Sequence, residues 1–169
     1  MTRNLNSSIV QLCPSAPDRV AKYFTEIFIS QTVKIPYQKP NMEDIIKIIP
    51  EITIDVCDTI EVELPNGEKG NKIFVVGNVY LKVQYVSTNL NQSVHFVRYQ
   101  IPFQAIILQP CGDLIDPTDS IFPDNYVVHV CIEKITKKII DNRTAHFEML
   151  MLVWVEEVDT PIPTPTPAP

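Results

Sequence analysis

Apolar and polar residues alternate along this chain, most clearly between Ile52 and Leu64. A period of two places successive side chains on opposite faces of a strand, so this run predicts a half-buried antiparallel strand. Pro65-Asn66-Gly67-Glu68 follows, and an Asn-Gly pair between two alternating runs is a strong β-hairpin signal. The expected apolar face consists of Ile52, Ile54, Val56, Ile60, Val62 and Leu64.

Similar runs elsewhere bring the expected number of strands to about seven. Pro102 and Pro110 interrupt one region and predict edge or bent strands there, because proline cannot donate a ladder hydrogen bond. Asp141 and Asn142 mark the turn of a second long hairpin. Besides the run from Ile52, the expected strands cover residues 26–35, 72–86, 93–103, 105–108, 126–133 and 143–156.

One short helix is expected between Asn41 and Pro50. Asn41 can cap it, Glu43 and Asp44 suit its first turn, and Pro50 ends it. A second turn of helix is expected over residues 18–24. Strands joined by turns with a single short helix predict an all-β fold, an antiparallel β-sandwich or jelly roll. The apolar residues of the expected helix are Ile45, Ile46, Ile48 and Ile49.

The chain of 169 residues is expected to form one domain with an extension at each end. We divide it into an N-terminal arm (1–25), a β-sandwich domain (26–157) and a Pro/Thr-rich tail (158–169) that ends in PIPTPTPAP. The arm carries a short apolar stretch of Ile9, Val10 and Leu12. Such a stretch, detached from the domain, is expected to bind a partner surface.

The net charge of −6 disfavours nucleic acid and anionic membranes as partners, since both require a basic surface. No run approaches the roughly 18 apolar residues of a membrane span, and the N-terminus lacks the apolar segment of a secretory signal. The protein is therefore expected to be made in a cytoplasm.

No phosphate-binding loop, nucleophile elbow or HExxH motif is present, so we expect no enzymatic activity, no cofactor and no metal. His129 and Cys131 share a strand face and are a weak metal candidate, but a surface pair is the favoured interpretation. Glu61 and Glu63 are interpreted as an exposed strand face rather than an acid and base pair. Asp113, Asp116, Asp119 and Asp124 form an acidic loop, interpreted as solvated rather than calcium-binding.

The last expected strand is apolar on both faces. Either it is a central, covered strand or its second face meets another subunit. Trp154 beside the tail is typical of an interface anchor. We expect assembly contacts at Ile9, Val10 and Leu12 on the arm and at Leu150, Leu152 and Trp154 on this strand.

The four cysteines, Cys13, Cys57, Cys111 and Cys131, are dispersed and form no CxxC pair. In a reducing cytosol four free thiols are expected, and disulfides persist only in oxidising surroundings. Cys13 is the candidate for an intersubunit disulfide because it lies on the arm. For Cys57 and Cys131 a buried free thiol is at least as good an interpretation.

Three stretches resemble the SPOCS-domain family of spore coat proteins in endospore-forming, mainly clostridial, bacteria. QTVKIPYQKPNMEDIIKIIPEITI (31–54) is similar to the family's opening, GNVYLKVQYV (77–86) to its glycine followed by a strand, and SVHFVRYQIPF (93–103) to a strand closed by a Pro-Phe pair. The similarity extends loosely to Asn142 and Arg143, where the family often carries an arginine between strands. It implies coat-assembly or adaptor modules with no catalytic residues, often beside a peptidoglycan-binding domain. From this sequence we expect a single domain without such a module.

We therefore expect a non-catalytic structural protein, deposited on the endospore surface and self-assembling head to tail into a coat lattice or appendage fibre. The arm of one copy would add to an exposed sheet edge of the next. The alternative is an adaptor that binds another coat protein without polymerising. A carbohydrate-binding sandwich has little support, because aromatics such as Tyr80 form no platform.

Overall fold

The computed structural model describes residues 21–91 and 93–158, and within them it contains six strands and no helix. The strands form two three-stranded antiparallel sheets, ordered β1-β6-β5 and β2-β3-β4. The predicted all-β antiparallel fold is confirmed, with six strands instead of about seven. The strands are β1 (Ala21–Lys34), β2 (Met42–Glu63), β3 (Lys69–Ser87), β4 (Val94–Ile107), β5 (Tyr126–Asp141) and β6 (Thr144–Glu157).

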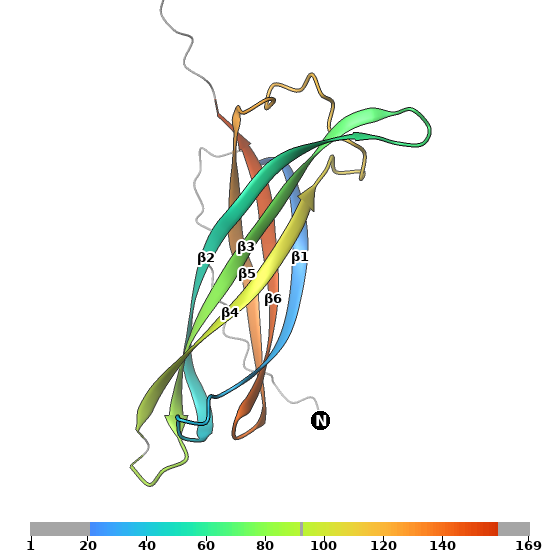
Figure 1. The fold of residues 1–169 in the computed structure, drawn as a ribbon. Coiled ribbons are helices and arrows are strands. Elements are labelled where there is room, and N and C mark those ends of the chain that lie inside the picture. Colours follow the sequence, from blue (N-terminus) through green and yellow to red (C-terminus); the bar gives the residue numbers. More distant parts are fainter. Residues whose placement is uncertain (1–20, 92, 159–169) are drawn as a thin grey trace, which may run out of the picture.

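The two sheets stack as layers, and the β2–β3 hairpin extends past the end of the other sheet (Figure 1). The central strands β3 and β6 contribute most of the fully buried side chains between the layers, because each is paired on both edges. Alternate residues of each strand face this core. They include Ile73, Val75, Val79 and Leu81 from β3 and Phe147, Met149, Met151, Val153 and Val155 from β6.

The prediction of a helix between Asn41 and Pro50 is wrong, because residues 42–50 belong to β2. The buried side chains here are Met42, Ile45 and Ile48, spaced by three. Two register shifts against β3, between Met42 and Asp44 and between Ile45 and Lys47, each insert one extra residue. A β-bulge of this kind stretches the spacing of inward residues from two to three, which imitates the period of a helix.

Two other expectations about secondary structure are wrong. Residues 21–24 of the expected helical turn at 18–24 begin β1, which starts at Ala21 rather than at residue 26. The two strands expected over residues 93–103 and 105–108 are one strand, β4. Because β4 is an edge strand, Pro102 can lie within it without losing an internal ladder bond, so the expected edge position is confirmed.

A third bulge divides the apolar face expected between Ile52 and Leu64. Ile54 pairs with Gly77 but Val56 pairs with Val76, so Asp55 is the extra residue. A shift of one residue sends every later side chain to the opposite face. Val56 and Ile60 consequently point outward and are 40% and 43% exposed. The prediction of one shared face is therefore wrong beyond Ile54.

Both expected turns are present. Gly67 has a φ of 84°, a conformation that glycine adopts easily, and its amide donates to the Leu64 carbonyl at 2.8 Å. In the second hairpin the Arg143 amide donates to Asp141 Oδ1 at 2.7 Å. The loop between β4 and β5 contains neither a helix nor one of the six strands, yet its residues Ile115 and Ile121 are fully buried.

Candidate assembly surface

The outer apolar face is the side of the β1-β6-β5 sheet that points away from the core. Along β6, Met149, Met151 and Val153 are fully buried inward, while the residues between them point outward. The strand is thus central in its sheet, and its outward side chains are only half covered. We define the outer apolar face by Phe24, Phe28, Leu150, Leu152 and Trp154.

Trp154 lies between Phe24 on β1 and His129 on β5. The His129 ring stacks on the indole with ring centroids 4.3 Å apart, and its Nε2 lies 2.6 Å from Glu156 Oε2. Phe24 is 50% exposed. Trp154 is therefore stacked against His129 and remains partly exposed beside Phe24, which suits an interface anchor.

The cross-strand neighbours of Leu150 and Leu152 continue the outer apolar face. Leu150 lies between Phe28, which is 64% exposed, and Lys134. Leu152 lies between Glu26 and Cys131. Two β1 phenylalanines and the outward β6 residues thus form an apolar strip across paired strands, which monomeric proteins seldom leave uncovered when it is contiguous.

Phe24 and Phe28 were not among the predicted interface residues. Tyr23, Ile27 and Ile29 of the same strand pack against the core. The run YFTEIFIS is therefore apolar on both faces, the same signal that singled out the last strand. Attention to that pattern would have identified both phenylalanines.

The cysteines differ from what the sequence indicates. Cys57, expected as a buried thiol, is exposed and free, as is Cys111. Cys131 is 5% exposed and disulfide-bonded, so the expectation of a free thiol there is wrong. The other predicted residues of the arm, Ile9, Val10, Leu12 and Cys13, lie outside the described residues.

The weak metal candidate does not assemble, since His129 already contacts Trp154 and Glu156. Within residues 21–91 and 93–158, no group of three or more His, Cys, Asp or Glu side chains could hold a metal ion. Tyr80, the isolated aromatic, has the Arg98 guanidinium 4.5 Å above its ring. The same part of the chain has no helix long and apolar enough to cross a membrane.

Two carboxylates of the acidic loop form hydrogen bonds or ion pairs with other residues of the chain. Asp116 accepts hydrogen bonds from the Thr118 amide at 2.8 Å and hydroxyl at 2.7 Å, which hold its pKa below the ordinary value. Asp119 accepts from the Tyr23 hydroxyl at 2.5 Å and pairs with Lys22 at 2.8 Å. These contacts fasten the loop to the start of β1.

Burial and hydrogen bonding act in opposite directions on Asp119. Burial alone would raise its pKa, but hydrogen bonds from Lys22, Tyr23 and the Ile121 amide outweigh it and the pKa is lowered. Burial, and then the bond to Asp119, raises the pKa of Tyr23 to about 12. The start of β1, where the arm joins the sheet, is thus held by charged groups.

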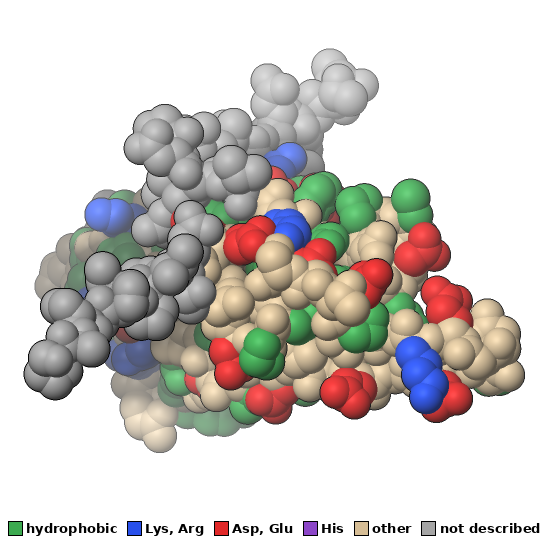
Figure 2. Space-filling view, turned by 90° about the horizontal axis from the view of Figure 1, so that it is seen from above, with side chains coloured by type: hydrophobic (Ala, Val, Ile, Leu, Met, Phe, Trp, Pro, Cys, Tyr) green, Lys and Arg blue, Asp and Glu red, His purple; other side chains and the backbone are tan. Residues whose placement is uncertain are grey.

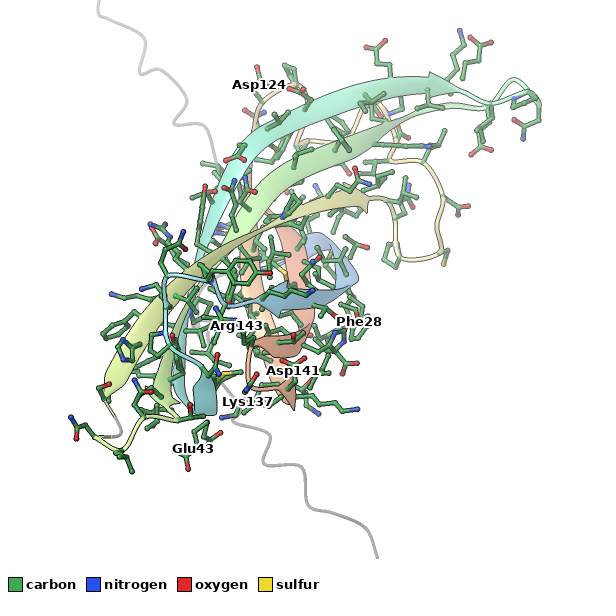
Figure 3. The ribbon with its side chains drawn as sticks, turned by 60° about the horizontal axis from the view of Figure 1, so that its bottom comes forward. Phe28, Glu43, Asp124, Lys137, Asp141 and Arg143 are labelled. Atoms are coloured by element: carbon green, nitrogen blue, oxygen red, sulfur yellow. The ribbon has the colours of Figure 1, made fainter. Side chains whose placement is uncertain are left out.

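Arg143, in the turn between β5 and β6, holds the connection from β1 to β2 (Figure 3). Its guanidinium donates to the Ile35 carbonyl at 3.0 Å, the Pro36 carbonyl at 2.6 Å and Asn41 Oδ1 at 2.7 Å. A planar group with several fixed donors can bind several acceptors at once. Arg143 thereby joins the two sheets at the end opposite the long hairpin.

Two stacked antiparallel sheets around one apolar core define a β-sandwich. A family model described as SipL, SPOCS domain, matches residues 41–140, which is more than half of the chain. The chain therefore belongs to the SPOCS-domain family, a non-enzymatic, spore-associated family. Neither a search of curated proteins nor a search of solved structures found a match.

Proposed function

We propose that this chain is a non-catalytic structural protein of the endospore surface that assembles with copies of itself into a coat lattice or an appendage fibre. Family membership supports the spore setting. The observation that carries self-assembly is the outer apolar face, where Phe24 and Phe28 are at least half exposed and Trp154 is half covered. Such a surface gains free energy when a partner covers it.

In this proposal the arm of one copy covers the outer apolar face of the next. Ile9, Val10 and Leu12 supply an apolar segment that suits Leu150, Leu152 and Trp154. The outer edges of β1 and β5 have no strand partner in the described part of the chain, so their backbone groups can bond an added strand. A head-to-tail contact that does not close on itself extends into a fibre.

The charge of the surface supports protein partners over nucleic acid. On the face drawn in Figure 2, Asp and Glu side chains are interspersed with apolar ones and no basic stripe crosses it. A net charge of −6 is consistent with this view. Repulsion between acidic copies would weaken assembly at low ionic strength, because salt screens exposed charges.

A second candidate function is that of an adaptor that binds another coat protein without polymerising. The observation in its favour is a separate apolar patch on the outer face of the β2-β3-β4 sheet. Val56 and Ile60 on β2 and Ile106 on β4 are 40%, 43% and 50% exposed. This patch lies on the extended hairpin and beside it, where a different partner can reach it.

The substitution Leu152→Glu tests which surface joins the copies. It places a charge in the centre of the outer apolar face, whereas the control Gln104→Glu adds the same charge to an exposed position on the other sheet. Analytical ultracentrifugation should find large species for the unmodified chain and for Gln104→Glu, with Leu152→Glu at least tenfold less assembled. Equal assembly of all three proteins would exclude the outer apolar face.

The same experiment separates the two candidate functions. An adaptor would sediment as a small, discrete species in all three forms. It would then be expected to bind a second coat protein through Val56 and Ile60, and Ile60→Glu would weaken that binding while Leu152→Glu would not.

A further inference from the structure

The outer face of the β2-β3-β4 sheet contains a hollow of about 500 Å³. All three strands contribute to it, since Ile49 on β2 pairs with Lys82 on β3, which pairs with Arg98 on β4. Its lining includes three cations and one acid, although the whole chain carries a net charge of −6. We define this basic groove by Lys39, Glu51, Tyr80, Lys82, Phe96 and Arg98.

Two cations of the basic groove lie over aromatic rings. Lys82 Nζ is 5.0 Å from the centre of the Phe96 ring, and the Arg98 guanidinium carbon is 4.5 Å from that of Tyr80. A ring positions a cation without neutralising it, so both side chains keep N–H donors for an anion. In residues 21–91 and 93–158 no carboxylate forms an ion pair with Lys82. The basic groove therefore suits a partner that carries carboxylates.

The one acid of the groove does not satisfy Arg98. Glu51 lies 3.4 Å from the guanidinium, with 69% of the Glu51 side chain and 59% of the Arg98 side chain exposed. Exposed pairs of this kind contribute little free energy and exchange partners easily. Arg98 is thus available to a carboxylate that arrives from outside.

The hairpin end of the same sheet has the opposite charge. Between residues 58 and 72 there are four exposed acids and two lysines, and the Asn71–Ile115 bridge joins this hairpin to a loop with four aspartates and no Lys or Arg. Asp and Glu side chains are spread over this end, from which Figure 2 views the molecule. The acids of this acidic hairpin are Asp58, Glu61, Glu63 and Glu68.

The acidic hairpin cannot reach the basic groove of its own chain. Lys72 and Lys82 are ten residues apart on β3, which is about 34 Å at 3.4 Å per residue. From Ile73 to Val86 this strand is paired on both edges and cannot fold back. The hairpin also projects past the other sheet, where a neighbour can meet it (Figure 1). Only a second molecule can bring the two surfaces together.

We infer that the acidic hairpin of one copy docks with its carboxylates in the basic groove of the next copy. This inference rests on the proposed self-assembly and names a contact for it. The contact joins opposite ends of one sheet, so it is head to tail and leaves a free hairpin and a free groove for further copies. It also lets chains of the same net charge associate, because the closest charges attract while the net repulsion is screened by salt.

Charge reversal tests the groove. Lys82→Glu combined with Arg98→Glu should weaken self-association at least tenfold in sedimentation experiments. The control combines Lys34→Glu with Lys138→Glu, which makes the same charge change at exposed positions on the other sheet and should assemble like the unmodified chain. Circular dichroism checks that each variant is folded. If the unmodified chain assembles and the groove variant assembles equally well, the inference is wrong and self-assembly stands.

A complementary variant tests the hairpin. Glu61→Lys combined with Glu63→Lys should also assemble poorly alone, whereas an equimolar mixture with the groove variant should recover assembly, because each basic hairpin then meets an acidic groove. A mixture that assembles no better than either variant alone would overturn the inference. An unmodified chain that stays monomeric would overturn both the inference and the proposed self-assembly.

Cross-linking of the unmodified chain provides a measurement that needs no variant. Equal amounts of ¹⁵N-labelled and unlabelled protein are assembled together and treated with a carbodiimide, which joins a lysine to a carboxylate in direct contact. Peptides that link Lys39 or Lys82 of one isotope to Glu61 or Glu63 of the other are expected. Assemblies whose links between isotopes avoid the basic groove would contradict the inference.

Discussion

The Phe103 ring lies directly over Gly77, in the space that a side chain at position 77 would need. The two residues pair across β3 and β4, and a Cβ added to Gly77 would lie 2.6 Å from the ring and 2.1 Å from the Thr53 carbonyl oxygen. The glycine and the Pro-Phe pair on which the family resemblance rests are thus one structural feature. It fixes the packing of the three strands at the point where β2 carries its third bulge.

Gly77→Ala should destabilise the fold by about 1–3 kcal/mol, because neither the ring nor the backbone oxygen can move away freely. Urea unfolding followed by circular dichroism measures this change. The control is Gly67→Asn in the β2–β3 turn, where nothing lies within 4 Å and asparagine tolerates a positive φ, so the cost should stay below about 1 kcal/mol. Equal costs for the two variants would contradict the role given to Gly77.

Arg143→Met should cost about 2 kcal/mol, because it removes donors to three backbone carbonyls, those of Ile35, Pro36 and Lys39, and to the Asn41 side chain. Arg98→Met is the matched control. Arg98 pairs with Glu51 at 3.4 Å on the surface, with 59% and 69% of the two side chains exposed, and such pairs contribute little. If both variants unfold at the same urea concentration, Arg143 does not hold the connection between β1 and β2.

Tyr23→Phe should change how stability depends on alkaline pH. The folded state raises the pKa of Tyr23 from 10.0 to about 12, so the stabilisation is complete below pH 10 and is lost as pH rises towards 12. The phenylalanine variant should be about 1–2 kcal/mol less stable at pH 7 and should lose less stability than the unmodified chain over that alkaline range. Parallel unfolding curves for both proteins between pH 9 and pH 12 would be the contrary result.

Asp119, the partner of Tyr23, gives an independent prediction for acidic pH. The pKa of Asp119 is lowered, so its contribution is present above the ordinary carboxyl value and is lost as pH falls through the folded-state value. Asp119→Asn removes this contribution and should flatten the stability profile below about pH 4. Thermal melts of both proteins from pH 2 to pH 7 measure the difference, and identical slopes would count against the contact.

Strand alternation and turn chemistry were sufficient to predict the fold class and both hairpins, since Asn66-Gly67 and Asp141-Asn142 end their strands as expected. The errors within β2 have one physical cause. Each bulge in β2 inserts a residue, which either imitates a helical spacing, as at Met42, Ile45 and Ile48, or reverses the faces, as after Asp55. Bulges depend on pairing with a partner strand, and the sequence of β2 alone does not contain that information.

The candidate surface was predictable in part for a related reason. The apolar residues on both faces of the last strand identified Leu150, Leu152 and Trp154 as candidates. The sequence could not show whether its second face is covered within the fold or meets another subunit. The structure places β6 in the centre of its sheet and still leaves its outer residues half covered. The two apolar faces of β1 also mark Phe24 and Phe28 in the sequence, but their position beside Trp154 and Leu150 follows only from the pairing of β1 with β6.

Electron microscopy of the purified chain, with and without residues 1–16, tests the central proposal most directly. We predict fibres or sheets for the full chain and only small particles for the shortened one, with both proteins giving the same far-ultraviolet circular dichroism spectrum. Undiminished polymers without residues 1–16 would contradict a role of the arm. A small, discrete species from the full chain would contradict self-assembly itself.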